Sequence, residues 1–172
     1  MKVLVTGGAG FIGGRIVQRL LRKGFEVHVL GRSTTPTTDG VPFHKVNLAR
    51  EEIPHQACDG VDAIFHVAAK AGVWGSAISY HAANILATRR VLKACRLHKI
   101  GFLVYTSSPS VVFSHDSIRG SDESIPYGKH WLCHYSRTKA MAEQEILAAN
   151  GEDGLRTIAL RPHLVWGAGD PH

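Results

Sequence analysis

The segment from Lys2 to Arg22 constrains the fold of this chain more than any other. A short apolar run, KVLVT, stops at a cluster of glycines, and an apolar pattern of helical period follows in FIGGRIVQRLL. This order predicts a strand, a tight turn and a helix. Gly7, Gly10 and Gly13 are spaced G-x-x-G-x-x-G, which suits a turn, a close approach of pyrophosphate and tight helix packing. A dinucleotide facing the helix N-terminus is the favoured interpretation, and a glycine-rich turn without a ligand is the alternative.

The rest of the chain alternates between strand and helix patterns. Together with right-handed crossovers, this predicts an α/β fold with a doubly wound parallel (Rossmann) sheet ordered 3-2-1-4-5-6, and one dinucleotide-binding domain over residues 1–172. The expected strands cover residues 2–6, 26–30, 43–47, 62–67, 102–106 and 156–161, and the expected helices cover 11–23, 78–98 and 135–149, with a weak one at 50–58.

Tyr135 and Lys139 lie one helical turn apart in HYSRTKAMAE. At this spacing both side chains leave the same face of a helix, so an ammonium group can sit beside a phenol. A neighbouring positive charge should lower the phenol pKa from about 10 toward the working range of acid–base chemistry on a carbonyl or an alcohol. The structural alternative is a tyrosine at the edge of the core and a solvated lysine.

The end of the second strand bears on the choice of cofactor. That strand ends in Gly31-Arg32-Ser33, without the acid that accepts hydrogen bonds from an adenine ribose in NAD-preferring sites. An arginine beside a hydroxyl can instead pair with a 2′-phosphate, so we expect NADP(H) to be preferred over NAD(H). The alternative for Arg32 is a solvated loop cation.

Composition excludes several classes of protein. The net charge of +6 comes from scattered residues, which does not suggest nucleic acid. Cys58, Cys95 and Cys133 form no C-x-x-C pair, which suits a reducing cytoplasm and free buried thiols. The eleven histidines show no metal-binding spacing, so no metal ligands are expected. No apolar stretch approaches the roughly 20 residues that span a bilayer, and a strand starting at residue 2 leaves no room for a signal peptide, so we expect a cytoplasmic protein.

Further motifs support a family resemblance. The segments TSSPS, HVAA and RPHLVWG, with Asn84 in the long central helix, stand in the order typical of the extended short-chain dehydrogenase/reductase superfamily, which the chain resembles over essentially its whole length. The segments FHVAAKAGVWGS and LRPHLVWGAGDPH look like the 3β-hydroxysteroid dehydrogenase-like branch. Within it, the chain is most similar to the reductases of bacterial olefin biosynthesis, which reduce long-chain 2-alkyl-3-oxo acids with NADPH.

The resemblance implies roles for individual residues. Tyr135 would protonate the carbonyl oxygen, Ser108 would donate a hydrogen bond to it, and Lys139 would hold the nicotinamide ribose. Asn84 would complete a proton relay or contact the substrate. Ser108 and Asn84 can equally be satisfied by local backbone, and Ser107 is a competing neighbour of Ser108. The implied cofactor contacts are Gly7, Gly10, Phe11, Ile12, Gly13, Arg32, Asn47, Leu48, Val67, Ala68, Ala69, Lys70, Thr106, Tyr135, Lys139, Pro162 and His163, with Asn47 standing where the family usually has aspartate.

The substrate side is read from fewer residues. Trp74, in the glycine-flanked loop GVWGS, can offer an indole face to an apolar substrate or close the core beneath its loop. Lys70 or His163 can meet a carboxylate of the substrate. A nucleotide-sugar epimerase or dehydratase would share the Tyr–Lys pair and the glycine loop, but Arg32 argues against it.

The resemblance also concerns the whole enzyme. Members of the superfamily have roughly twice this length, so the chain is expected to be the N-terminal portion of a longer enzyme, either as a fragment or as a truncated product. A non-catalytic dinucleotide-binding protein or an inactive truncated form is the alternative of another class. The family also implies a homodimer through two long helices of each subunit and association with other enzymes of its pathway.

Overall fold

The structure is a computed structural model that describes residues 1–32, 40–113 and 120–170. Its strands are β1 (Lys2–Thr6), β2 (Glu26–Gly31), β3 (Phe43–Lys45), β4 (Ala63–His66), β5 (Phe102–Thr106) and β6 (Arg156–Leu160). Its α-helices are α1 (Phe11–Arg22), α2 (His55–Cys58), α3 (Ala77–Tyr80), α4 (Ala87–His98) and α5 (His134–Ala148). A π-helix, η1 (His81–Leu86), joins α3 to α4, and two 3₁₀ turns are η2 (Pro109–Val112) and η3 (Glu152–Gly154).

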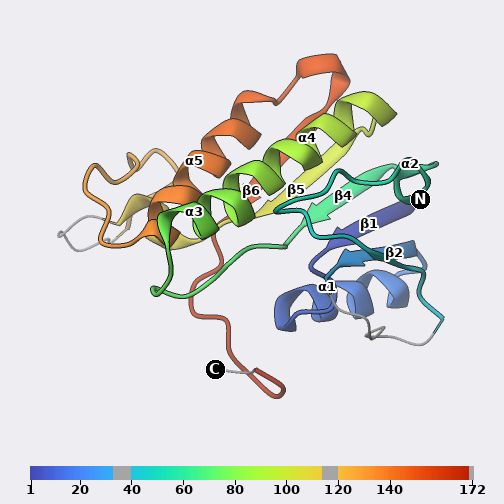
Figure 1. Cartoon of the computed structure of the whole chain (residues 1–172), viewed down its shortest axis with the longest axis horizontal. Coiled ribbons are helices and arrows are strands. Elements are labelled where there is room, and N and C mark those ends of the chain that lie inside the picture. Colours follow the sequence, from blue (N-terminus) through green and yellow to red (C-terminus); the bar gives the residue numbers. More distant parts are fainter. Residues whose placement is uncertain (33–39, 114–119, 171–172) are drawn as a thin grey trace.

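The six strands form one sheet in the order β3-β2-β1-β4-β5-β6, and this confirms the predicted topology (Figure 1). Every pair of neighbouring strands is parallel; Val5, for example, lies opposite Val29 of β2 on one side and opposite Phe65 of β4 on the other. The carboxyl ends of all strands therefore meet along one edge of the sheet. In doubly wound sheets this edge is where ligands bind.

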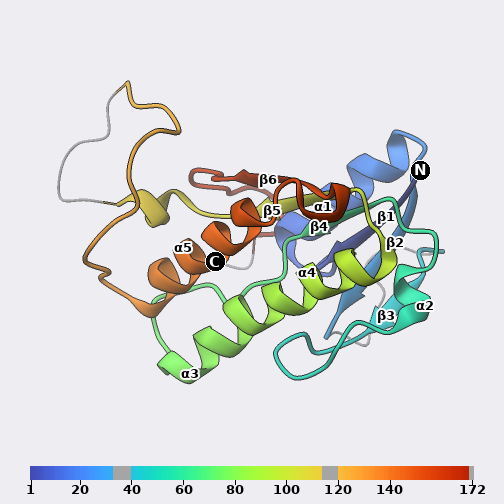
Figure 2. The same cartoon turned by 90° about the horizontal axis from the view of Figure 1, so that it is seen from above.

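Helices cover the two faces of the sheet unequally. The helices α4 and α5 lie side by side over one face, and α1 lies on the other (Figures 1 and 2). Strand β1 is buried on both faces because Leu4 points to the core under α4 and α5, whereas Val3 and Val5 point to the core under α1. A run of consecutive apolar residues is what such a central parallel strand requires.

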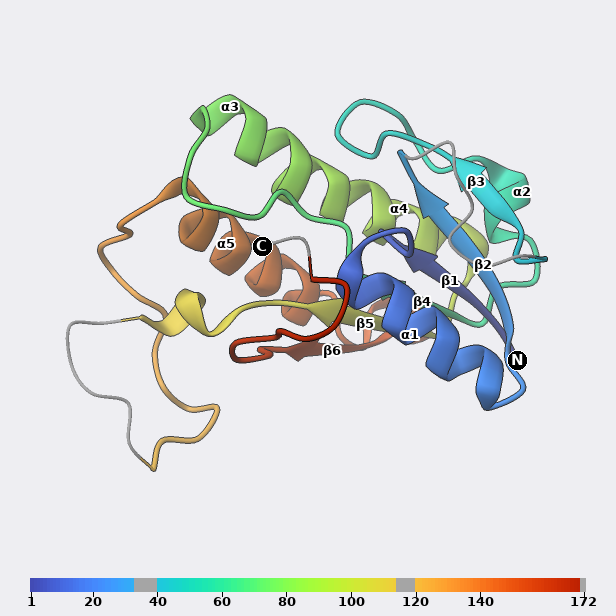
Figure 3. The ribbon, with the colours of Figure 1, turned by 90° about the horizontal axis from the view of Figure 1, so that it is seen from below.

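Strands β5 and β6 are covered on one face only. On the side of α1, no helix in the described part of the chain lies over them (Figure 3). The side chains of Phe102, Ile158 and Leu160 are consequently 38%, 51% and 49% exposed. Helices thus cover both faces of the sheet around β1 but only one face at β6.

Two expected helices differ from the structure. The weak helix expected at 50–58 is confined to α2, because residues 47–50 form a turn and Pro54, with an extended backbone, directly precedes the first helical residue. The helix expected at 78–98 is helical throughout, but it contains the π-helix η1, which its sequence did not indicate. The other expected elements agree with the observed bounds to within two residues at either end, which is the usual scatter at element ends.

The described residues add two observations. None of their helices has the length and apolar character needed to cross a bilayer. Nor do they hold any group of three or more histidine, cysteine, aspartate or glutamate side chains that could bind a metal ion.

Candidate active site

The glycine turn between β1 and α1 is held together by backbone atoms. Gly7 has a positive φ of 70°, and a β-carbon at this position would lie 2.8 Å from the backbone nitrogen of Ala68. A β-carbon at Gly13 would lie 2.1 Å from the carbonyl oxygen of Gly7. Both positions therefore require glycine for steric reasons. The third glycine of the motif brings α1 against the turn, as the spacing predicted.

Gly10 opens the helix that follows. Its own amide donates to the carbonyl oxygen of Gly7 at 2.9 Å, and no side chain caps the first turn of α1. The free N–H groups of such a helix start, together with the helix dipole, favour a negatively charged group. Phe11 and Ile12, the next two residues, are half-buried. The tight turn and the uncapped helix start fit a dinucleotide pyrophosphate.

The residues predicted to contact the adenosine part of the cofactor show fewer features of a binding site. Arg32 directly follows β2 and is exposed, and its predicted partner Ser33 lies outside the described residues. The side-chain oxygen of Asn47 accepts a hydrogen bond from the amide of Ala49 at 3.2 Å, so it closes a local turn. Leu48 is buried in the core. Of these residues, Arg32 is thus the one whose side chain is open to solvent.

The end of β4 is fixed beside the glycine turn by a buried polar chain. The hydroxyl of Thr6 accepts from the amides of Val67 and Ala68, both at 3.2 Å, and contacts Nδ1 of His66 at 2.8 Å. Nε2 of His66 lies 3.0 Å from the hydroxyl of Thr88. Burial, with a smaller contribution from the charge of Lys139, lowers the pKa of His66 to about 3. The imidazole is therefore neutral, and the chain of hydrogen bonds is fully satisfied.

Asn84 lies in the π-helix η1, a type of distortion that often marks functional sites. Its side chain accepts from the amide of Lys70 at 2.7 Å, and donates to the carbonyl oxygen of Lys70 at 3.2 Å and to the hydroxyl of Thr138 at 3.0 Å. It thus ties the loop after β4, which includes the exposed Ala69, to the start of α5. These partners lie 14 and 54 residues away along the chain, so Asn84 is not satisfied locally within its helix.

Ser107 and Ser108 have separate partners. The hydroxyl of Ser107 is buried and donates to the carboxylate of Glu143. The hydroxyl of Ser108 accepts from the amide of Ser110 at 3.3 Å, and it lies close enough to Tyr135 to lower the pKa of that phenol. Ser108 is therefore the serine that faces the phenol, and it also caps η2.

Lys139 is 2% exposed and donates to the carbonyl oxygen of Thr106 at 2.5 Å. Its ammonium group lies 4.0 Å from the ring centre of Tyr105. Burial lowers the pKa of Lys139 to about 7, although the charge of Glu143 acts in the opposite direction. Half-buried Pro162 and exposed His163 follow β6 at the same edge of the sheet.

The expectation that Lys139 lowers the pKa of Tyr135 is wrong for this structure. Burial raises the pKa of Tyr135, and the nearby hydroxyl of Ser108 offsets only part of that effect. The lysine ammonium is directed at Thr106 and Tyr105, and desolvation of the phenol outweighs any attraction. Tyr135 is consequently a neutral phenol around pH 7.

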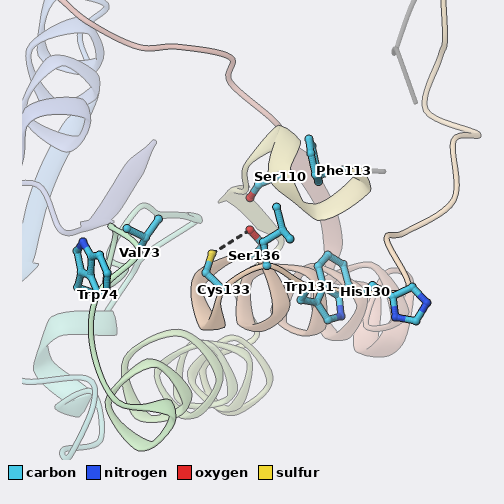
Figure 4. A pocket seen from close by; sticks show the side chains of 9 residues that line it. Val73, Trp74, Ser110, Phe113, His130, Trp131, Cys133 and Ser136 are labelled. Carbon is cyan, nitrogen blue, oxygen red and sulfur yellow. Dashed lines mark hydrogen bonds between the residues drawn. The ribbon is translucent and has the colours of Figure 1, made fainter. Parts of the chain in front are cut away.

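An apolar cavity of about 420 Å³ adjoins this group of residues (Figure 4). Trp74 and Val73 line it from the loop after β4, and the start of α5 with the residues before it lies opposite. The hydroxyl of Ser110, also on its wall, lies 2.9 Å from that of Ser108. The cavity therefore adjoins the hydroxyl that faces Tyr135. Its remaining lining residues are Phe113, His130, Trp131, Leu132, Cys133 and Ser136.

The structure decides between the two interpretations of Trp74. The indole is 88% exposed, so Trp74 does not close the core and instead forms part of the cavity wall. Tyr80 fixes the loop that carries Trp74, because its buried hydroxyl donates to the carbonyl oxygens of Gly72 at 2.7 Å and Trp74 at 3.1 Å. Lys70, proposed for a carboxylate, has its ammonium 5.0 Å from the ring centre of the same tyrosine.

Cysteine placement needs one correction. Cys58 and Cys95 are free buried thiols as expected, but Cys133 is only half-buried. It precedes α5 as the N-cap residue and lines the cavity, and its sulfur lies 3.4 Å from the hydroxyl of Ser136.

Sequence reasoning missed most of the residues that line the cavity, and it also missed a buried carboxylate. Trp131 and Phe113 line the cavity, and Glu143 is buried one helical turn after Lys139. For the two aromatic residues the sequence holds no signal, because they come from irregular segments. Glu143 had one, since it follows Lys139 by four positions and must share its helix face.

This fold and this arrangement of Ser108, Tyr135 and Lys139 place the chain among the short-chain dehydrogenases/reductases, as the motifs predicted. The 3-beta hydroxysteroid dehydrogenase/isomerase family matches residues 4–172, and the chain belongs to that family. The narrower resemblance read from the sequence is thereby confirmed.

Known proteins extend the comparison. The chain is 48% identical to the 2-alkyl-3-oxoalkanoate reductase of Stenotrophomonas maltophilia, covering 99% of this chain and 52% of that protein. It is 38% identical to the 3 beta-hydroxysteroid dehydrogenase/Delta 5-->4-isomerase of Mycobacterium tuberculosis, covering 98% and 48%. The structure of MoeE5 with UDP-glucuronic acid and NAD matches with a TM-score of 0.85 and 33% identity, covering 99% of this chain and 57% of that one. The chain thus spans about half the length of the curated relatives it matches.

Proposed function

We propose that this chain carries the cofactor-binding and catalytic part of an NADPH-dependent reductase that interconverts a ketone and a secondary alcohol. One observation supports this above the others. Ser108, Tyr135 and Lys139 gather at the carboxyl edge of the sheet, beside an apolar cavity. A proton donor, a hydrogen-bond donor and a cation are what a forming alkoxide needs.

The cofactor would supply or accept the hydride. On this proposal the glycine turn and the start of α1 hold its pyrophosphate, Lys139 and the carbonyl oxygen of Thr106 meet its nicotinamide ribose, and Arg32 pairs with its 2′-phosphate. No acid follows β2 at Gly31-Arg32, so nothing at these two positions repels that phosphate. Asn47 and Leu48 would lie under the adenine, and Val67 to Lys70, Pro162 and His163 would flank the rest of the molecule.

The side chains favour the reducing direction near neutral pH. Because burial raises the pKa of Tyr135, its phenol carries a proton that it can give to a carbonyl oxygen. The hydroxyl of Ser108 would donate a hydrogen bond to the same oxygen, while the cationic form of Lys139 would stabilise the phenolate left behind. Oxidation of an alcohol needs the deprotonated phenol and should therefore accelerate as the pH rises.

For the substrate we propose a long-chain 2-alkyl-3-oxo acid. The cavity offers indole, phenyl and aliphatic surface to an alkyl chain, and His130 and Ser110 are polar groups on its wall. The relative of 48% identity is named for this reaction class. A 3β-hydroxysteroid is a second candidate because of the relative of 38% identity, and a UDP-sugar is a third because of the match to MoeE5. The homodimer and the pathway partners implied by the resemblance also remain proposals.

A cofactor titration and a substrate panel test this function. NADPH should bind more tightly than NADH, and Arg32→Ala should weaken NADPH by about 1–3 kcal/mol with little change for NADH. Long-chain 2-alkyl-3-hydroxy acids, hydroxysteroids and UDP-sugars are then offered with NADP⁺, and the absorbance of NADPH is followed. Equal affinity for the two cofactors contradicts the NADPH preference. Turnover of a UDP-sugar alone contradicts the reductase assignment.

A further inference from the structure

Glu143 is a buried carboxylate to which the proposed reaction assigns no role. It lies on α5, one turn after Lys139 and two turns after Tyr135, and it is 1% exposed. A carboxylate removed from water is costly unless it is paired and hydrogen-bonded. Its surroundings therefore show what it holds in place.

Three segments donate to this carboxylate. The hydroxyl of Ser107, after β5, donates to Oε2. The hydroxyl of Tyr127, from the segment before α5, donates to Oε1 at 2.9 Å. Arg161, after β6, donates to Oε1 through Nε at 3.0 Å and through Nη2 at 2.6 Å. Charge-assisted bonds of this kind are strong and directional.

Each of these segments carries a group of the candidate site. Ser107 immediately precedes Ser108, which faces Tyr135. Tyr127 lies three residues before His130, where the cavity wall of residues 130–133 begins. Arg161 immediately precedes Pro162 and His163. One buried side chain thus fastens the hydroxyl, the cavity wall and the end of β6 to the helix that bears Tyr135 and Lys139.

Glu143 also acts on Lys139 through its charge. Burial disfavours the ammonium, and the carboxylate one turn away favours it. Burial keeps His66 and Tyr105 neutral around pH 7, since it lowers the pKa of the first and raises that of the second. The titratable and charged groups around the pair are His66 from β4, Tyr105 from β5, Tyr135 from α5, Tyr127 from the segment before α5, and Arg161 from the end of β6.

We propose that Glu143 is a positioning residue of this site, whose carboxylate holds Ser107, Tyr127 and Arg161 in place and whose charge favours the ammonium form of Lys139 one turn away. Its hydrogen bonds to Ser107, Tyr127 and Arg161, and its place one turn from Lys139 on the same helix, are features of the structure, whereas its effect on catalysis rests on the function proposed above. The two can be tested separately, because the titration of Lys139 can be followed without a cofactor.

The first measurement follows the ε-carbon shift of Lys139 by NMR from about pH 5 to about pH 9, with the signal assigned from its loss in Lys139→Arg. Glu143→Gln keeps the size of the side chain and removes its charge. The midpoint of Lys139 should fall by about one pH unit, because an opposite charge one helical turn away is removed. Glu145→Gln is the matched control, because Glu145 is on the same helix and pairs with Arg89 at the surface at 2.7 Å.

The control variant should leave the midpoint unchanged. An unchanged or raised midpoint in folded Glu143→Gln overturns the proposal. If that variant does not fold, Glu143→Asp replaces it, since it keeps the charge but withdraws it by one methylene. The midpoint should then fall by about half a unit, and its constancy overturns the proposal in the same way.

The second measurement is the affinity for NADPH across the same pH range. With a midpoint lowered from about 7 to about 6, the cationic fraction of Lys139 at pH 7 drops from about a half to about a tenth, so binding should weaken about fivefold. At pH 5 both proteins should bind NADPH almost equally. A loss of equal size at every pH indicates a merely structural role and overturns the proposal. Failure of the parent protein to bind NADPH refutes the proposed function and leaves the NMR result to stand by itself.

Discussion

The glycine turn and the apolar cavity are built in opposite ways. Around Gly7 and Gly13 the spaces that side chains would occupy are filled by backbone atoms of the neighbouring strand end and of the turn itself. The cavity has walls of side chains, and two of them, Trp74 and Leu132, are 88% and 73% exposed. One half of the site is therefore closed by the main chain, and the other is open and formed by replaceable groups.

This difference suits two kinds of ligand. A dinucleotide presents the same pyrophosphate to every member of a large class of proteins, so a backbone cradle that admits no side chain serves it well. A substrate differs from one enzyme to the next, and loop side chains can change without disturbing the sheet. Substitutions in the closed half should consequently alter folding and cofactor binding together, whereas substitutions in the open half should alter substrate binding alone.

Gly13→Ala should have the largest effect. The new methyl group would lie 2.1 Å from the carbonyl oxygen of Gly7, and its nearest neighbours, in Gly7 and Gly8, are backbone atoms that cannot rotate away. We expect the free energy of unfolding to fall by about 3 kcal/mol or more, with loss of NADPH binding. Urea unfolding and a cofactor titration measure the two effects.

Gly14→Ala provides the matched control for that change. Its methyl group would meet only the carbonyl oxygen of Gly8, at 3.6 Å, in ordinary contact. Alanine is the better helix former by about 1 kcal/mol, so the variant should be as stable as the parent or more so. Equal destabilisation by the two substitutions would contradict the view that the turn is closed at Gly13.

Tyr135→Phe tests the residue that is proposed to act where the cofactor half of the site meets the substrate half. It removes the proton donor and keeps the ring, so turnover should fall by at least about 10²-fold. The affinity for NADPH should survive this change better than Lys139→Ala, because only the lysine is proposed to contact the ribose. The measurement uses a ketone that the parent protein reduces. Turnover close to that of the parent would refute the role assigned to Tyr135.

The closed half of the site was largely predictable from the sequence. The spacing of Gly7, Gly10 and Gly13 and the apolar run before them are local patterns that fix a turn whatever lies around it. The strand order also followed, because alternating strand and helix patterns permit few right-handed arrangements. Tyr135 and Lys139 were found by their separation along one helix.

The open half was not predictable to the same extent. Trp131 reaches the cavity only because its irregular segment packs on Val111, Val112 and Ala140, which lie in other elements. The pKa of Tyr135 was expected in the wrong direction, because burial depends on the whole fold and not on the spacing of two residues. Asn84 carried no sign that its helix would be a π-helix.

Acid should weaken the closed half through His66, which supports the strand end beside the turn. Its pKa of about 3 in the folded protein lies below the usual value of about 6.5 in the unfolded chain. The unfolded chain therefore binds the proton first, and the stability that the neutral imidazole gives is present above about pH 6.5 and is lost as the pH falls toward 3. Between about pH 6.5 and pH 5, the free energy of unfolding should drop by roughly 1.5 kcal/mol.

Urea unfolding of His66→Gln at several pH values checks this. The variant should lose less stability than the parent over that interval, whatever its stability at pH 7. Burial also lowers the pKa of His44, so His44→Gln shows how much of the pH dependence arises away from the site. A slope with pH that is the same in His66→Gln as in the parent would exclude the histidine as the cause.

Trp74→Ala should have the smallest effect on the stability of the fold. It tests whether the exposed cavity wall contributes to folding at all. The indole is 88% exposed and belongs to no buried cluster of the described residues, so the free energy of unfolding should stay within about 0.5 kcal/mol of the parent value. Trp131→Ala is the comparison, because that indole also lines the cavity but packs on a buried cluster, and about 1–3 kcal/mol should be lost. Both variants should raise KM for an alkyl substrate several-fold, since each removes apolar surface that an alkyl chain would cover. A loss above 1 kcal/mol in Trp74→Ala would show that its loop is part of the folded core and that the open half is closed as well.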